Sequence, residues 1–167
     1  MYHPRILNVQ ERQNLSSMVS LAEIQAASLL LEGKVIRTPL VYSPTFSEMT
    51  GGEVYLKLET MQKAGSFKVR GAANRIFGKR SEIGKRGVIA ASAGNHAQGV
   101  AVAASMAGVA ATIVMPEWVS LAKQEATVGY GARVILRGGS LEESIAHAMQ
   151  AALDEEMTFI HPYDDPL

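Results

Sequence analysis

The second half of the chain alternates short apolar runs with longer amphipathic ones, and this alternation constrains the fold more than any other feature. Strands are expected at 87–91, 111–115, 133–136 and 158–161. Helices are expected between them, at 95–107, from about 121 to 130, and at 141–154. Short strands that alternate with helices of about 10–15 residues are typical of a parallel sheet with helices on both faces. The sequence therefore predicts an α/β fold, with 92–95 at the carboxyl end of a strand, where such sheets bind ligands.

Capping patterns mark the starts of two helices. Ser20 with Glu23, and Ser140 with Glu143, have the Ser-x-x-Glu spacing of a capping box, in which each side chain accepts a hydrogen bond from the other residue's backbone. The first box is expected to open a helix that stops at Gly33 and buries Ile24, Ala27, Leu30 and Leu31. The second is expected to open the helix at 141–154, whose apolar face is Ile145, Ala148, Met149 and Ala152.

A lysine follows the one strand expected in the first half of the chain. That strand, at 53–59, alternates apolar and other residues, and Gly65 breaks the chain after it. Ser66 is expected to cap a helix that carries Ala72, Ala73, Ile76 and Phe77 on one side. Lys68 then lies in the first helical turn, where the helix dipole and its apolar neighbours disfavour the charged amine. Such a lysine can form a Schiff base, whereas the alternative is an ordinary solvated lysine.

A second motif follows the strand at 87–91. It reads Ser92-Ala93-Gly94-Asn95-His96-Ala97-Gln98-Gly99 and leads into a helix rich in small residues. A strand, a glycine turn and a helix in succession present unpaired backbone N–H groups at the start of the helix. These groups suit an anion such as a carboxylate.

Together, the motif at 92–99 and Ser66-Phe67-Lys68-Val69-Arg70-Gly71-Ala72 resemble the serine/threonine dehydratase family. These are pyridoxal-phosphate (PLP) enzymes with the tryptophan-synthase-β-like fold (fold type II), and the threonine dehydratase (threonine ammonia-lyase) branch is the most similar. The resemblance covers about residues 18 to 167. It implies PLP as cofactor and conversion of L-threonine to 2-oxobutanoate and ammonia, or of L-serine to pyruvate and ammonia.

The resemblance also implies roles for single residues. Lys68 would hold PLP through its amine and then act as the base at the α-carbon of the substrate. Phe67 would lie beside the cofactor ring, with plain core packing as the alternative, and Asn95 would hydrogen-bond the ring hydroxyl. The substrate carboxylate would be held, mainly by backbone N–H groups, in the loop of Ser92, Ala93, Gly94, Asn95 and His96. For His96 we favour shaping of this loop over proton transfer, because Lys68 already supplies a base.

Two positions separate branches of the family. Racemases that resemble this chain carry a hydroxyl residue where Ala93 stands, and a methyl group cannot shuttle a proton. The branch that performs β-replacement usually has threonine where this chain has His96. A serine racemase or a β-replacement enzyme is therefore a weaker alternative.

The resemblance divides the chain into four parts. Residues 1–17 are expected to be a flexible extension, 18–86 the N-terminal segment of the larger PLP domain with the Schiff-base lysine, 87–160 a smaller open α/β domain, and 161–167 the return to the larger domain. Family members are much longer than this chain, and no run of three glycines is present that could cradle the cofactor's phosphate. We therefore expect the N-terminal portion of a dehydratase, inactive alone, that forms a homo-oligomer or pairs with a missing C-terminal half. The alternative is a non-catalytic fragment or interaction module unable to hold PLP.

Composition excludes several other classes. The formal net charge of zero offers no basic stripe for nucleic acid, and no apolar run reaches the roughly 18–20 residues that span a membrane. The absence of cysteine excludes disulfides and thiol catalysis and fits a reducing cytoplasm. Asp164-Asp165 could be proposed as a metal pair, but adjacent carboxylates are usually solvated turn residues, so no metal is expected.

Overall fold

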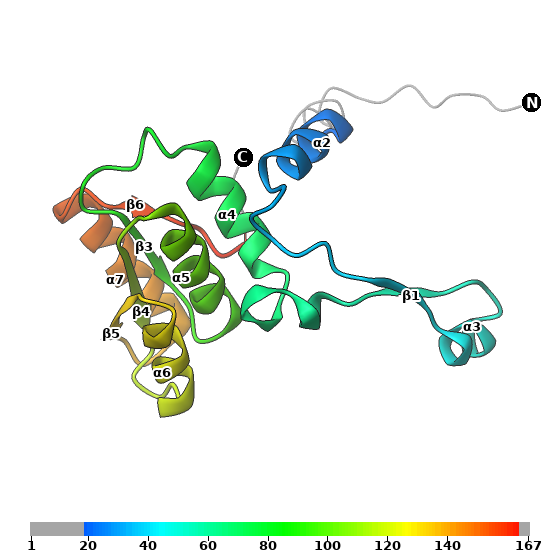
Figure 1. The fold of residues 1–167 in the computed structure, drawn as a ribbon. Helices are drawn as coiled ribbons and strands as arrows, with labels where there is room; N and C mark the ends of the chain where they lie inside the picture. The colour runs from blue at the N-terminus through cyan, green and yellow to red at the C-terminus, as the bar shows by residue number, and fades with distance from the viewer. Residues whose placement is uncertain (1–18, 164–167) are drawn as a thin grey trace, which may run out of the picture.

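A computed structural model of the protein describes residues 19–163, and within them the predicted parallel sheet is present (Figure 1). Its four strands lie in the order β5-β4-β3-β6. They are β3 (Val88–Ala91), β4 (Ala111–Met115), β5 (Arg133–Leu136) and β6 (Thr158–Phe159). The helices that connect them are α5 (Asn95–Ala107), α6 (Leu121–Gly129) and α7 (Leu141–Asp154). The expected extension at 1–17 and the Asp164-Asp165 pair lie outside the described residues.

Both faces of the sheet are covered, as predicted. Val88 and Ala90 of β3 belong to the larger core cluster, together with residues of α5. Ile89 and Ala91 belong to a second cluster, in which Ala148 of α7 is buried. Successive side chains of a strand point to opposite faces, so a strand covered on both sides needs an uninterrupted apolar run.

Local periodicity predicted the elements of this sheet closely. The bounds of α5, β4, β5 and α7 agree with the expected ones. The strand expected at 158–161 is shorter and ends at Phe159, although the N–H of Ile160 still donates to the carbonyl of Ile89 at 2.9 Å. Pro162, which has no N–H, prevents the ladder from continuing.

Two details of α7 differ from the prediction. Ser140 Oγ accepts a hydrogen bond from the N–H of Glu143 at 3.2 Å, but the carboxylate of Glu143 accepts from Gly139, at 2.8 Å, and the capping box is only half formed. Ala148 is buried, whereas Met149 is 52% exposed. Met149 lies about 100° further around the helix than Ala148, at the edge of the face that meets the sheet.

Residues 19–65 form an arm that extends from the sheet (Figure 1). It contains α2 (Leu21–Leu30), β1 (Leu40–Tyr42), α3 (Pro44–Thr50) and β2 (Tyr55–Lys57), then the short 3-10 turns η1 (Glu59–Met61) and η2 (Lys63–Gly65). β1 and β2 pair antiparallel as a two-stranded ribbon. Helix α4 (Lys68–Gly78) joins the arm to the rest of the fold.

Two predictions for the arm are wrong in part. The capping box of Ser20 and Glu23 is complete, but α2 ends at Leu30 instead of Gly33 and contains no buried residue. Only Leu31, just beyond the helix, is buried among the residues of its predicted apolar face. The strand expected at 53–59 is confined to 55–57, and every one of its residues is exposed. In both cases the apolar pattern is present, but no second layer covers it within the described residues.

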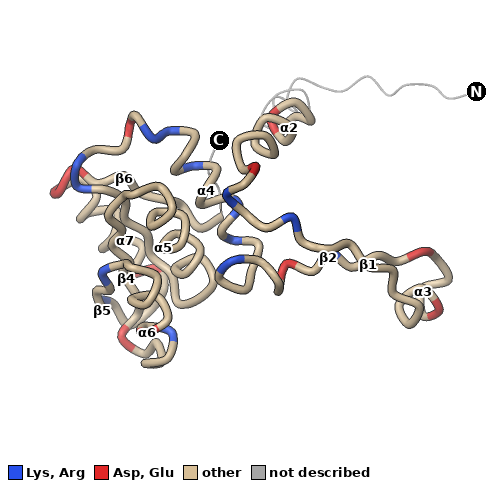
Figure 2. Tube along the Cα trace, in the orientation of Figure 1, with Lys and Arg blue, Asp and Glu red and all other residues tan. Residues whose placement is uncertain are grey.

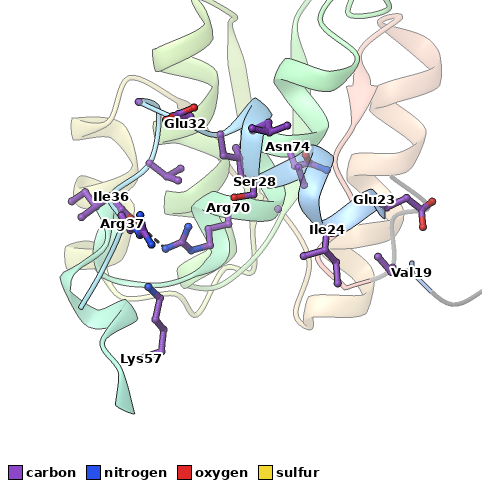
Figure 3. A pocket seen from close by; sticks show the side chains of 16 residues that line it. Val19, Glu23, Ile24, Ser28, Glu32, Ile36, Arg37, Lys57, Arg70 and Asn74 are labelled. Carbon is purple, nitrogen blue, oxygen red and sulfur yellow. Dashed lines mark hydrogen bonds between the residues drawn. The ribbon is translucent and has the colours of Figure 1, made fainter. Parts of the chain in front are cut away.

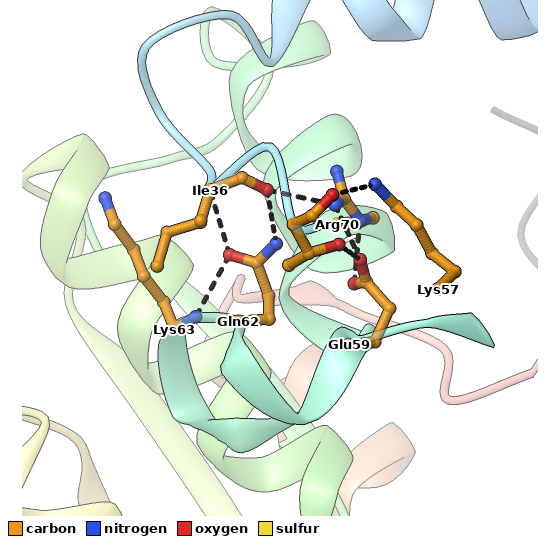
Figure 4. A network of polar contacts seen from close by, with 7 residues as sticks. Ile36, Lys57, Glu59, Gln62, Lys63 and Arg70 are labelled. Atoms are coloured by element: carbon orange, nitrogen blue, oxygen red, sulfur yellow. Dashed lines mark hydrogen bonds and ion pairs between the residues drawn. The ribbon is translucent and has the colours of Figure 1, made fainter. Parts of the chain in front are cut away.

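A polar network attaches the arm to α4 (Figure 4). Arg70 on α4 makes two hydrogen bonds to the carboxylate of Glu59, at 2.8 and 2.7 Å, and a third to the carbonyl of Ile36 at 3.0 Å. The buried amide of Gln62 binds both backbone groups of Ile36, at 2.9 and 2.8 Å. The Arg70 guanidinium lowers the pKa of Glu59 to about 2, so this pair stays charged at neutral pH.

The distribution of charge follows this architecture (Figure 2). Residues of both signs lie along the arm and in the loops, and α5, which packs between α4 and the sheet, carries no charged residue. Across residues 19–163, none of the helices has the length and apolar character needed to cross a membrane.

The sheet core can be tested with one truncation. We expect Ile113→Ala in β4, where the side chain is 0% exposed, to lower the free energy of unfolding by about 2–5 kcal/mol in urea titrations. The matched control is Val128→Ala in α6, which is 55% exposed and should change this free energy by no more than about 0.5 kcal/mol. Similar losses for both variants would contradict the burial of β4.

Candidate functional site

Lys68 lies in the first turn of α4, as predicted, but it is the first residue of the helix, which begins later than predicted. The N-cap is Phe67, and no side chain caps the helix. Ser66, the predicted cap, has an extended backbone and is buried, and among the described residues its Oγ has no hydrogen-bond partner. Gly65, with φ +67°, ends the 3-10 turn before it. Ser66 therefore connects the turn to α4 from inside the fold and does not cap the helix.

The amine of Lys68 has a defined position. The residue is half-buried, and its Nζ donates a hydrogen bond to the carbonyl of Pro162 at 2.8 Å. Nζ also lies 5.4 Å from the ring centre of Phe67 and 5.2 Å from that of Tyr163. A carbonyl and two aromatic faces are partners that a lysine ammonium group prefers. The amine is thus held beside the chain segment that follows β6.

His96 is buried next to this amine. It is 6% exposed, and its Nε2 lies 3.2 Å from the carbonyl oxygen of Ile160. Burial lowers the pKa of His96 to about 4, the nearby charges of Lys68 and His161 act in the same direction, and the hydrogen bond to Ile160 opposes them. The imidazole is therefore neutral near pH 7, and because a carbonyl can only accept, Nε2 carries the proton.

One pocket, of about 240 Å³, brings three predicted site residues together. Phe67, Lys68 and His96 line it, and the other lining residues are Gly71, Ala72, Arg75, Ile160, His161, Pro162 and Tyr163. Phe67 is 58% exposed, so its ring forms an open wall beside the amine and is not part of the core. The carbonyls of Ile160 and Pro162 were not predicted as site groups, because a backbone acceptor leaves no signal in the residue type.

The other predicted residues form the loop at the start of α5 and do not line this pocket. Ser92 is buried, and its Oγ accepts a hydrogen bond from the N–H of Gly94 at 3.1 Å. Ala93 packs, half-buried, against the larger core cluster. Gly94 is the N-cap of α5, and Asn95, its first residue, is exposed. Since the N–H of Gly94 is already used, the backbone donors that remain for an anion begin at Asn95.

A larger cleft, of about 860 Å³, lies between α2 and α4 (Figure 3). Apolar residues such as Ile24 line it together with Arg37, Lys57 and Arg70. None of the predicted site residues is among its lining. We therefore place the candidate site at the smaller pocket, which holds the lysine and the buried histidine.

The fold and the site define a class of protein. A parallel α/β sheet leads through a glycine-containing loop into α5, whose buried His96 shares a pocket with the half-buried Lys68 at the start of α4. Residues 31–167 match the family model described as pyridoxal-phosphate dependent enzyme. The chain belongs to this family of enzymes, whose cofactor is pyridoxal phosphate.

Three relatives show where in the family the similarity is strong. The chain is 50% identical over 149 residues to L-threonine ammonia-lyase from Thermotoga maritima. The matched region covers 89% of this chain and 37% of that protein. It superposes on serine racemase from Dictyostelium discoideum with a TM-score of 0.79 and 36% identity, covering 88% of this chain and 48% of that one. It also superposes on the processed form of threonine deaminase isoform 2 from Solanum lycopersicum, with a TM-score of 0.76 and 35% identity. This match covers 89% of this chain and 42% of that one. The predicted fold type is confirmed, and the chain spans less than half the length of these relatives.

The buried state of His96 predicts how stability depends on pH. The folded pKa of about 4 is below the ordinary 6.5, so protons bind preferentially to the unfolded chain, and stability is lost as pH falls from about 6.5 towards 4. We expect a loss of about 3 kcal/mol from this residue, measured by urea unfolding across that range.

A matched pair of variants isolates the histidine. His96→Asn should flatten the pH dependence between 6.5 and 4. His147→Asn, at an exposed position in α7, should keep it. An unchanged slope in His96→Asn would show that the imidazole titrates normally in the folded protein.

Proposed function

We propose that this chain is the lysine-bearing part of a pyridoxal-phosphate-dependent threonine/serine ammonia-lyase. Such an enzyme converts L-threonine to 2-oxobutanoate and ammonia, and L-serine to pyruvate and ammonia. The observation that carries the proposal is the position of Lys68, whose amine lies in one pocket with His96 at the start of α5. The 50% identity to an L-threonine ammonia-lyase supports this choice of reaction.

The residues at the pocket fit one side of the cofactor. Lys68 offers a half-buried primary amine to the aldehyde, and the open ring of Phe67 beside it offers a face to the pyridine. Asn95 is exposed at the start of α5, so its amide is available to the ring hydroxyl. No group for the phosphate is assigned, because the chain lacks a run of three glycines. When bound, PLP supplies an electron sink for negative charge at the α-carbon of the substrate.

Each residue then has a separate task. The Lys68 amine takes the proton from the α-carbon, for which a positioned base is needed. The first free N–H groups of α5, from Asn95 onwards, bind the substrate carboxylate. His96 shapes this loop through its hydrogen bond to Ile160, and because its ring is buried and neutral it does not exchange protons with the substrate.

We further propose that the chain works as part of a larger catalytic unit. Large apolar side chains are exposed along the arm, among them Leu40, Val41, Phe46, Met49 and Leu56. Exposed apolar surface of this kind marks an interface, and the chain spans only 37% to 48% of its relatives. We propose 18–86 as the start of a larger domain, 87–160 as the smaller one and 161–167 as the return. A C-terminal half would cover the arm, the assembly would be a homo-oligomer, and the isolated chain would be inactive.

Racemisation of serine is a second candidate, favoured by the similarity to the Dictyostelium serine racemase. It requires an acid on the face of the substrate opposite to the lysine. Ala93, at the position where related racemases carry a hydroxyl, has only a methyl group, and it packs against the core. We therefore prefer elimination to racemisation, and also to β-replacement.

The proposal is tested by trapping the lysine. The chain is incubated with pyridoxal phosphate, reduced with borohydride, digested and analysed by mass spectrometry. We expect the pyridoxyl adduct at Lys68 in excess over Lys57 and Lys63, and its loss in Lys68→Ala. Formation of 2-oxobutanoate from L-threonine should require addition of the C-terminal half of a relative. Equal labelling of all three lysines, with no product in the presence of that half, would instead support the non-catalytic alternative.

A further inference from the structure

Gly99 lies directly against the start of the lysine helix. It is the last residue of the second sequence motif, and the proposed function gives it no role. A Cβ atom built on Gly99 would lie 2.9 Å from the carbonyl carbon of Lys68, 2.9 Å from the nitrogen of Val69 and 3.1 Å from the Cβ of Lys68. Two of these three atoms belong to the backbone, which cannot rotate away as a flexible side chain can. Gly99 is therefore the position at which a side chain would push α4 away from α5.

The surrounding interface is built from small side chains. On α4, Ala72 and Ala73 are buried, and on α5, Val100 and Ala103 are buried in the same cluster. Small residues allow two helices to approach closely, because the separation of their axes depends on the side chains at the contact. Gly99, which has no side chain at all, allows the closest approach of the two helices, and it lies against the N-terminal end of α4, where Lys68 stands.

The same contact connects the two halves of the candidate site. His96 stands three residues before Gly99, so both lie on one side of α5. Its ring binds the carbonyl of Ile160, while the amine of Lys68 binds the carbonyl of Pro162, two residues further along the chain. A displacement of α4 relative to α5 would therefore move the amine relative to both the loop at 92–96 and the segment at 160–162.

We propose that Gly99 is a positioning residue for Lys68: its missing side chain lets the first turn of α4 rest on α5 and so places the amine in the pocket that it shares with His96. The inference deepens the proposed function, because it concerns the lysine to which that function assigns the cofactor. The contact itself is a property of the chain and can be measured without cofactor or substrate.

Other glycines provide the matched control. Gly129 is the last residue of α6, and a Cβ there would meet nothing within 4 Å. Alanine forms helices better than glycine, so Gly129→Ala should raise the midpoint of thermal unfolding slightly or leave it unchanged. The same exchange at Gly99, inside α5, has at least as large a helical advantage, so a negative effect there would come from the contact with Lys68.

The experiment measures the reactivity of the lysine amines. The folded chain is treated with limiting acetic anhydride, and acetylation at each lysine is quantified by peptide mass spectrometry. In the unaltered chain we expect Lys68 to react several-fold more slowly than the exposed Lys123, and this difference should disappear in urea. In Gly99→Ala the ratio of Lys68 to Lys123 should rise several-fold, while in Gly129→Ala it should stay unchanged.

A second variant separates positioning from general overpacking. Ala103→Ser adds an atom to the same helix interface one turn further from Lys68, at a buried position. It should lower the thermal midpoint without raising the reactivity of Lys68. A similar rise in Ala103→Ser, or no rise in a folded Gly99→Ala, would overturn the inference. Acetylation of Lys68 as fast as that of Lys123 in the unaltered chain would also overturn the inference. This test remains valid even if Gly99→Ala fails to fold.

Borohydride trapping with pyridoxal phosphate then distinguishes the inference from the proposed function. If the adduct at Lys68 is lost in Gly99→Ala and retained in Ala103→Ser, the positioning role of Gly99 and the proposed function are both supported. A shift in acetylation with no adduct in the unaltered chain would support the positioning role and count against the proposed function. Equal acetylation and equal adducts in all variants would overturn the positioning role and leave the proposed function intact.

Discussion

The close packing of α4 on α5 is the contact on which the rest of the structure depends. One side of α4 lies against α5 and through it against the sheet, since Val69, Ala73 and Ile76 are completely buried. The charged side chain of Arg70 holds the arm through Glu59 and Ile36. Helix α4 thus links the arm to the sheet domain, and α5 also contacts the arm, at the turn of Lys63–Gly65. Its first residue, Lys68, is placed by the same packing, so the candidate site and the attachment of the arm share one physical cause.

The backbone after β6 is the second element that organises the site. The carbonyls of Ile160 and Pro162 accept hydrogen bonds from His96 and Lys68, which come from two different helices. Backbone carbonyls are strong acceptors that must be paired when buried, so this segment supplies two fixed points without any functional side chain. The neutral, buried imidazole suits such a task, because it donates one directed hydrogen bond and carries no charge that would need solvent.

The sequence was most informative where the interactions that determine an element lie within one short segment. The apolar runs of β4 and β5 and the spacing of α5 and α7 predicted the bounds of these elements, because burial on both faces of a sheet or on one face of a helix imposes a period. The capping box of Ser20 succeeded for the same reason, since both partners lie within one helical turn. Predictions failed where two local partners compete. Glu143 binds Gly139 instead of Ser140. The prediction for Ser66 also failed, because this residue is buried with an extended backbone and no side chain caps α4.

By itself the sequence determined the α/β class, the order of the elements from β3 to β6, and the two motifs that carry the resemblance to pyridoxal-phosphate enzymes, whereas β1 and α3 of the arm were not predicted. Only the tertiary structure decided how those motifs meet. The hydrogen bond from Lys68 to Pro162 joins residues 94 positions apart, and the bond from His96 to Ile160 joins residues 64 positions apart. No local period encodes such contacts, because they arise only when sheet topology and helix packing bring distant backbone atoms together. The same holds for Gly99, whose importance follows from the backbone of another helix that lies where its side chain would be.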